Sequence, residues 1–254
     1  MLSLLLAGLV GCSTAPPEKT VPPAKTPASA GRVTAPTPIR LTATLVSPVD
    51  ITLAWQGDDP DAVGRTVEFA TEPQGQWTII EFLQARQTTF THPDLIPQTP
   101  FYYRLRSVYG PASQALQVTM PKGALTKKIQ KKDHSWMAPR TVPGGPVATQ
   151  SIRNTGTTAA GAPTDLKATI MHANGVKFTW TDHASDEEGY LIEVKAAGSP
   201  DFRVAAVLDP DVNSFGLITL PEEKHASFRV RAFYYGTPSN VAHQTTGADP
   251  SSDG

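Results

Sequence analysis

Residues 175–194 read GVKFTWTDHASDEEGYLIEV and hold the pattern that decides the fold. Apolar and polar side chains alternate up to Trp180, an acidic turn follows, and a second apolar run begins at Tyr190. A period of two is typical of a strand with one buried face, and a polar turn between two such runs predicts a change of strand. The stretch therefore predicts two neighbouring β-strands.

The same pattern occurs 125 residues earlier in the chain. Each copy contains several short alternating segments, separated by turn sequences such as DDPDAVG and DPDVNS. Short strands at regular spacing, without helical periodicity, predict an antiparallel sandwich in each copy. The residue pairs that share the spacing are Leu41 and Leu166, Trp55 and Trp180, Gly64 and Gly189, Glu68 and Glu193, Leu83 and Leu208, Phe90 and Phe215, Arg104 and Arg229, and Arg106 and Arg231.

Both copies resemble the fibronectin type III module along their whole length. The run WTDHASDEEGYLIE is similar to the bacterial form of the module, and LIPQT at residues 95–99 is similar to the turn before its sixth strand. The resemblance implies that Trp55 and Trp180 are core residues. Phe101 and Ala226 stand where a hydrogen-bonded tyrosine is usual, so this corner departs from the family. The predicted fold class is all-β, with two immunoglobulin-like (fibronectin type III) antiparallel sandwiches joined by a long flexible linker.

These patterns predict six segments. They are a lipoprotein signal segment at 1–11, a disordered proline-rich tether at 12–36, the first type III domain at 37–121, a basic and then Gly/Thr/Ala-rich linker at 122–161, the second domain at 162–246 and a disordered tail at 247–254.

The only cysteine of the chain, Cys12, ends the sequence Leu-Val-Gly-Cys. The apolar run before it is shorter than the ~20 residues of a spanning helix and is typical of the core of an export signal. It lacks basic residues, which indicates that the true start lies upstream. The four residues resemble the bacterial lipobox, which implies cleavage before Cys12 and attachment of palmitate-type chains. An incidental cysteine in an ordinary secretory signal is the alternative.

The lipobox resemblance also implies a localisation. Several acyl chains on Cys12 anchor a protein stably, whereas one chain binds only marginally. Ser13 follows the cysteine, and this favours the outer membrane, facing the periplasm, with the cell surface as an alternative.

Residues 122–140 carry six basic side chains and one acid. We expect Leu125, Ile129 and Trp136 to share one face of a short helix. Such a helix can lie on anionic lipid, on lipopolysaccharide phosphates or in a groove of a partner, and a solvated linker is the simpler alternative. The lysines around this face are Lys127, Lys128, Lys131 and Lys132.

Aromatic residues supply a second candidate binding surface. Tyr102, Tyr234 and Tyr235 lie in runs that break strict alternation. Together with Trp136 they are candidates for exposed binding residues, because aromatic side chains are enriched at binding hot spots.

No motif of an enzyme, cofactor or zinc site occurs in the sequence, since the six histidines are scattered and no P-loop or nucleophile elbow is present. The acidic turn from Asp182 to Glu188 offers oxygen ligands for Ca²⁺, but aspartate is common in turns for conformational reasons, so we predict no metal. The formal net charge of −1 gives no field that would attract nucleic acid.

The predicted function is therefore noncovalent. We expect an envelope lipoprotein that is not an enzyme, holds no cofactor and acts as a protein-binding or structural component of an envelope assembly. Binding of a polysaccharide or the cell wall is the alternative, and it would require a row of exposed aromatic side chains on one face.

Overall fold

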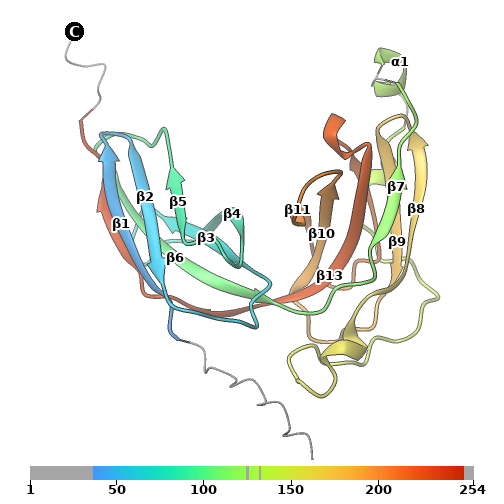
Figure 1. Ribbon diagram of the computed structural model, residues 1–254, viewed down its shortest axis with the longest axis horizontal. Coiled ribbons are helices and arrows are strands. Elements are labelled where there is room, and N and C mark those ends of the chain that lie inside the picture. The colour runs from blue at the N-terminus through green and yellow to red at the C-terminus, as the bar shows by residue number, and fades with distance from the viewer. Residues whose placement is uncertain (1–36, 124–125, 132, 249–254) are drawn as a thin grey trace, which may run out of the picture. The chain divides into compact units, whose positions relative to one another are not determined.

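A computed structural model describes residues 37–123, 126–131 and 133–248, and nearly all of its regular elements are β-strands (Figure 1). Cys12, the predicted tether, Leu125, Lys132 and the predicted tail after residue 248 lie outside the described residues. Within the described part, no helix has the length and apolar character needed to cross a membrane. The short helices are α1 (Lys127–Gln130), η1 (Ser135–Met137), η2 (Thr158–Gly161) and η3 (Pro221–Glu223).

The first sandwich is built from the sheet β1-β2-β5 and from strands β4, β3 and β6 of a second sheet. The predicted alternation is present in β2, where Ile51, Leu53 and Trp55 face the core and none is more than 4% exposed. They pack on Val67 and Leu105 of the opposite sheet. The strand bounds are β1 (Arg40–Ser47), β2 (Asp50–Gln56), β3 (Gly64–Ala70), β4 (Thr78–Gln84), β5 (Thr89–His92) and β6 (Pro100–Tyr109).

The second sandwich repeats this arrangement with the sheet β8-β9-β12 and strands β11, β10 and β13. Val176, Phe178 and Trp180 of β9 are at most 5% exposed and pack with Ile192 and Val230. Two antiparallel sandwiches, as predicted, are therefore confirmed. The strand bounds are β8 (Thr164–His172), β9 (Gly175–Thr181), β10 (Gly189–Ala196), β11 (Arg203–Leu208), β12 (Ser214–Ile218) and β13 (His225–Pro238).

The last strand of each repeat lies in the sandwich of the other repeat. Strand β7 (Leu116–Thr119) follows β6 in the chain but pairs antiparallel with β13, and in Figure 1 it lies among the strands of the second sandwich. Strand β14 (Ala242–Thr245) follows β13 but pairs antiparallel with β6. The two repeats are therefore joined by a reciprocal exchange of strands.

Two serines make equivalent contacts at this exchange. The N–H of Ser113 donates to the carbonyl of Val230 at 2.7 Å, and the N–H of Val230 donates to Ser113 Oγ at 3.1 Å. Ser239 makes the same pair of bonds with Leu105, at 2.8 and 3.0 Å. The ranges 37–121 and 162–246 thus mark the repeat in the sequence, whereas each sandwich takes its last strand from the other half of the chain.

A direct pairing of β6 with β13 adds to the connection. Tyr109 lies opposite Tyr234, so that strands of both sandwiches form one eight-stranded sheet. Val108, Leu191 and Phe233 form a buried apolar cluster beside this pairing. Backbone hydrogen bonds and apolar burial therefore both hold the sandwiches together.

The segment between the repeats is anchored to the second sandwich, in contrast to the flexible linker that its composition predicts. Ile152 is 1% exposed, and its N–H donates to Asp186 at 2.7 Å. Arg140 pairs with Ser214 at the edge of β12. Composition predicts flexibility because a polar segment has little apolar surface to bury, but contacts with a preformed sandwich offset its conformational entropy.

Candidate binding site between two sheet edges

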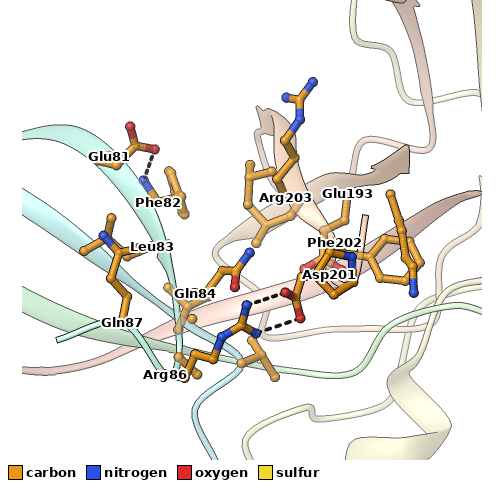
Figure 2. A pocket seen from close by; sticks show the side chains of 18 of the residues that line it. Glu81, Phe82, Leu83, Gln84, Arg86, Gln87, Glu193, Asp201, Phe202 and Arg203 are labelled. Atoms are coloured by element: carbon orange, nitrogen blue, oxygen red, sulfur yellow. Dashed lines mark hydrogen bonds and ion pairs between the residues drawn. The ribbon is translucent and has the colours of Figure 1, made fainter. Parts of the chain in front are cut away.

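A groove of about 750 Å³ lies between β4 and β11, the two end strands of the eight-stranded sheet (Figure 2). Its lining is partly apolar, because Val108 and Leu191 are buried there with Phe82 and Val204 packed against them. Side chains from both end strands and their neighbouring turns add a polar lining, and they include Glu81, Gln84, Arg86, Lys195, Asp201 and Arg203.

One ion pair connects the two sides of the groove, as the dashed lines in Figure 2 mark. Arg86 donates two N–H groups to the carboxylate of Asp201, with Nη1 2.7 Å from Oδ1. Hydrogen bonding from Arg86 lowers the pKa of Asp201, and the same bond raises the pKa of Arg86. Because the Arg86 side chain is 67% exposed, water and salt screen the attraction, and the pair contributes little to the stability of the fold.

Both strands that border the groove are irregular. The register of β3 with β4 shifts between Val67 and Glu68, and that of β10 with β11 shifts at the equivalent place, between Ile192 and Glu193. A bulge twists an edge strand and interrupts its row of free backbone groups. The groove therefore suits a loop or side chains of a ligand better than an added strand.

In each sandwich, the strand next to the border strand of the groove carries a carboxylate that binds two arginines. In the first sandwich Glu68 accepts hydrogen bonds from Nε of Arg104 and Nε of Arg106, both at 2.6 Å. The guanidinium of Arg104 stacks on Trp77 at 4.3 Å, and that of Arg106 stacks on Tyr235 at 4.1 Å. These cation–π contacts hold the arginines in place.

The second sandwich repeats this cluster at the spacing of 125 residues. Glu193 accepts from Arg229 at 2.5 Å and from Arg231 at 3.2 Å, and Arg229 stacks on Phe202 at 4.0 Å. Arg231 also donates to the carbonyl of Gly110, in the connection to the exchanged strand β7. Burial lowers the pKa of Arg231. These residues stabilise the sheet and the exchange.

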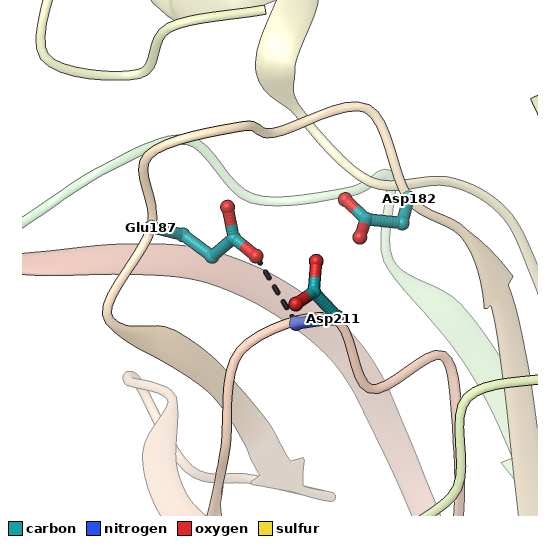
Figure 3. Close-up of side chains that lie close together, drawn as sticks. All are labelled: Asp182, Glu187 and Asp211. Carbon is teal, nitrogen blue, oxygen red and sulfur yellow. Dashed lines mark hydrogen bonds between the residues drawn. The ribbon is translucent and has the colours of Figure 1, made fainter. Parts of the chain in front are cut away.

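Three carboxylates of the second sandwich lie together, as Figure 3 shows. One oxygen each from Asp182, Glu187 and Asp211 lies within 4.8 Å of the others. Burial raises the pKa of Asp182 and of Glu187. Asp182 accepts hydrogen bonds from the hydroxyl of Tyr190 and the N–H of Ala184, and Glu187 accepts from the N–H of Asp211 at 3.2 Å. The carboxylates of Asp182 and Glu187 thus act as acceptors that hold turns together.

The residues of the acidic turn at 182–188 do not form a single site. Asp182 and Glu187 lie in the carboxylate cluster, whereas Asp186 and Glu188 bind the connecting segment. Asp186 accepts from Ile152 and Ser151 of the connecting segment, and Glu188 pairs with Arg153 at 2.7 Å. Asp211 was not expected in this cluster because it lies in a turn far along the chain. Its only signal in the sequence is the second acidic turn, DPDVNS.

The aromatic residues predicted as an exposed surface are half-buried and engaged within the protein. Tyr102 stacks on His243 at 4.6 Å, and Tyr234 stacks on Tyr109 at 5.2 Å. Tyr235 lies over Arg106. The runs break alternation because their outer faces cover the exchanged strand β14 or the junction between sandwiches. They do not form one free patch.

The predicted amphipathic helix is replaced by two short elements. Helix α1 ends at Gln130, and Trp136 belongs to η1, where its ring lies so close to Gly216 of β12 that a Cβ there would be 2.4 Å from it. Lys127, Lys128 and Lys131 are exposed. A helix of four residues cannot present a continuous apolar face. The exposed lysines therefore form a basic group that is not part of an amphipathic helix.

No model of a known protein family matches the chain, and no curated protein matches it either. The solved structures similar to it include a two-domain fibronectin type III segment from chicken tenascin, which is 13% identical, with 84% of this chain and 99% of that chain covered and a TM-score of 0.26. The fibronectin domains FN1–FN3 of chicken CNTN1 are 14% identical, covering 84% of this chain and 66% of that one, with a TM-score of 0.26. A redesigned β-sandwich protein is 23% identical over 30% of this chain and 77% of that one, with a TM-score of 0.26.

Proposed function

We propose that this protein is a lipid-anchored component of the bacterial cell envelope that binds another protein noncovalently and carries out no catalysis. The proposed anchor is Cys12, which rests on its resemblance to the lipobox. The proposed location is the outer membrane, on the side facing the periplasm. The proposed partner is a protein of an envelope assembly.

Among the described residues, the exposed large apolar side chains are aliphatic or methionine rather than aromatic, and this supports a protein partner rather than a glycan. All tryptophans, tyrosines and phenylalanines of the chain lie among the described residues, and each is buried or half-buried. The exposed large apolar side chains of the described part are aliphatic or methionine, as at Val147, Met171 and Val207. A sugar ring needs an open aromatic face to stack on, whereas aliphatic side chains and free strand edges are used in contacts between proteins. This difference is the observation that carries the proposal.

The strand exchange supports the same function. Each sandwich is completed by a strand of the other repeat, so the two modules are coupled by more than a linker. A surface that is ordered before binding loses less entropy when a partner docks. Two coupled sandwiches therefore make a preorganised binding unit.

Affinity isolation of the full-length protein from mildly solubilised envelopes, followed by mass spectrometry, tests the proposed function. We expect one envelope protein to elute in a near-equal amount. Elution of the protein alone, together with retention on immobilised envelope polysaccharide, would replace protein binding by the glycan alternative.

Membrane fractionation tests the anchor separately. We expect Cys12→Ser to move the protein from the membrane fraction to the soluble fraction, because the acyl chains supply the membrane affinity. Unchanged membrane association of this variant would refute lipid attachment at Cys12.

A further inference from the structure

In each sandwich, the first strand of one sheet lies next to the exchanged strand of the opposite sheet. We call this contact the seam, and it differs between the two sandwiches. In the first sandwich this seam lies between β1 and β14, and in the second it lies between β8 and β7. The inward-facing residues of β1 and β8 correspond at the spacing of 125 residues. They are Leu41, Ala43 and Leu45 in β1, and Leu166, Ala168 and Ile170 in β8.

An asparagine closes the seam of the first sandwich. The side-chain oxygen of Asn240 accepts the N–H of Leu41 at 2.8 Å, and its Nδ2 donates to the carbonyl of Leu41 at 2.9 Å. Leu41 is 3% exposed. Backbone groups at the edge of β1 are therefore already used, and its first inward-facing side chain is covered.

The seam of the second sandwich is open. A slot of about 390 Å³ lies between β7 and β8. Ile170, which corresponds to the half-buried Leu45, is 39% exposed. Gln114 follows Ser113 as Asn240 follows Ser239, and it is exposed. The apolar residues that line the slot are Leu116, Val118, Leu166, Ala168 and Ile170.

Free strand edges border this slot on both sides. Within the described part, β7 pairs only with β13 and β8 pairs only with β9. The register of β8 with β9 is regular from Lys167 to Ile170. Unlike the bulged edges at the groove, this run of β8 offers a regular row of backbone groups to an added strand.

Basic side chains lie beside the slot and beyond one end of it. Lys167 is exposed in the middle of β8. Lys224 Nζ donates to the carbonyl of Gly123 at 2.6 Å and to the carbonyl of Ala173 at 2.9 Å. Gly123 precedes α1 and Ala173 follows β8, so the chain passes the end of β8 before it reaches the exposed lysines of α1. Among the described residues the ion pairs are all made by arginines, which leaves the charge of these lysines available to a partner.

We infer that the seam between β7 and β8 binds an extended segment of the partner protein, with alternating apolar residues and an acidic end. The segment adds as a strand to β8, its apolar side chains fill the slot beside Lys167, and its acidic end lies beyond the end of β8, near α1. Pairing of two copies through β8 is disfavoured, because Lys167 would place a positive charge from each copy on the shared edge. This inference rests on the proposed function.

A labelled synthetic peptide tests the inference with the full-length protein. In the peptide, valine alternates with threonine and a short run of glutamates forms one end. Fluorescence anisotropy should show salt-sensitive binding that is about tenfold weaker when lysines replace the glutamates. Hydrogen exchange should show protection of residues 167–170 by the peptide. Equal binding of both peptides, or concentration-dependent dimers of the protein alone, would overturn the inference.

Variants of the seam make the test specific. Ile170→Asp and Gln114→Asn should each weaken peptide binding about tenfold, since the first puts a charge in the slot and the second supplies the asparagine that closes the other seam. Val207→Asp, at an exposed apolar position of β11 away from the slot, and Asn240→Gln, in the other sandwich, are the matched controls and should bind as wild type. Unchanged binding by Ile170→Asp would place the peptide elsewhere.

The same variant separates this inference from the proposed function. If Ile170→Asp still co-elutes with the envelope partner found for the wild type, protein binding stands and the seam is not its site. If the partner is lost with Ile170→Asp and kept with Val207→Asp, the seam is its site.

Discussion

Trp55 in the first sandwich and Trp180 in the second have equivalent places in the core, and both are nearly fully buried. The margins of the two sandwiches are less alike. Arg106 keeps 23% of its side chain exposed, whereas the equivalent Arg231 keeps 6%. Asn240 bonds to Leu41 across one seam, and the other seam is open. Duplication of a sequence thus reproduces the core, while differences that can carry function accumulate at the edges.

Removal of β14 should produce the largest difference in stability between the two sandwiches. Ending the chain after Pro238 should unfold the first sandwich, at a cost on the order of 5 kcal/mol, because β6 loses its exchanged partner strand. The second sandwich should keep its protection, since β7 supplies its last strand. Hydrogen exchange followed by mass spectrometry measures the two separately. Selective loss of protection in the second sandwich would show that the strands are not exchanged.

Neutralisation of the buried carboxylates should affect the two sandwiches unequally. We expect Glu193→Gln to destabilise the protein by about 3 kcal/mol and Glu68→Gln by about half as much. Arg231 is left charged and buried in the first case, whereas Arg104 and Arg106 remain partly hydrated in the second. Urea denaturation of both variants measures the difference. Equal losses would contradict the role given to the burial of Arg231.

Ser113 and Ser239, the serines at the strand exchange, should have a smaller effect. Each substitution should destabilise the sandwich of the other repeat. Ser113→Ala should destabilise the second sandwich and Ser239→Ala the first, each by about 1 kcal/mol, because each removes an acceptor for a strand N–H of the other repeat. Local hydrogen exchange at Val230 and at Leu105 reports the two effects. An effect of each variant within its own repeat would argue against the exchange.

A change of pH should produce the smallest difference. Burial raises the pKa values of Asp182 and Glu187 above the usual 3.8 and 4.5, so these two groups bind protons more readily in the folded state and add stability to the second sandwich as the pH falls through the raised values. The lowered pKa values of Asp186 and Asp201 act in the opposite direction at lower pH. A hydrogen bond from Ser47 lowers the pKa of Asp50, so the first sandwich loses stability as the pH falls through that lowered value. Local hydrogen exchange from pH 7 to about pH 3 measures both trends.

Asp182→Asn is the control for the pH effect. It should weaken the gain of the second sandwich, because the amide of the substituted side chain cannot take up the proton. A pH profile that Asp182→Asn leaves unchanged would assign the gain to other groups.

The two margins also explain why part of the candidate site was not predicted. The equivalence of Glu68 with Glu193 and of Arg106 with Arg231 is visible in the sequence, because a duplication keeps its spacing. The pair of Arg86 with Asp201 is not, because Arg86 follows β4 of one sandwich and Asp201 precedes β11 of the other. At the spacing of 125 residues their counterparts are Asp211 and Gln76, so the repeat does not conserve the pair. Contacts between elements far apart in the chain leave no local periodicity.

The sequence by itself determined the strands, their buried faces and the duplication, because alternation and spacing are local properties of the chain. Only the tertiary structure decided which last strand completes which sandwich, that the connecting segment is anchored, and which seam stays open. β6 and β13 correspond at the spacing of 125 residues, so the alternation of β7 and β14 does not tell which of the two each strand pairs with. The path of the chain and the packing at Ser113, Ser239 and the β6–β13 pairing make the choice, and these are contacts between distant residues.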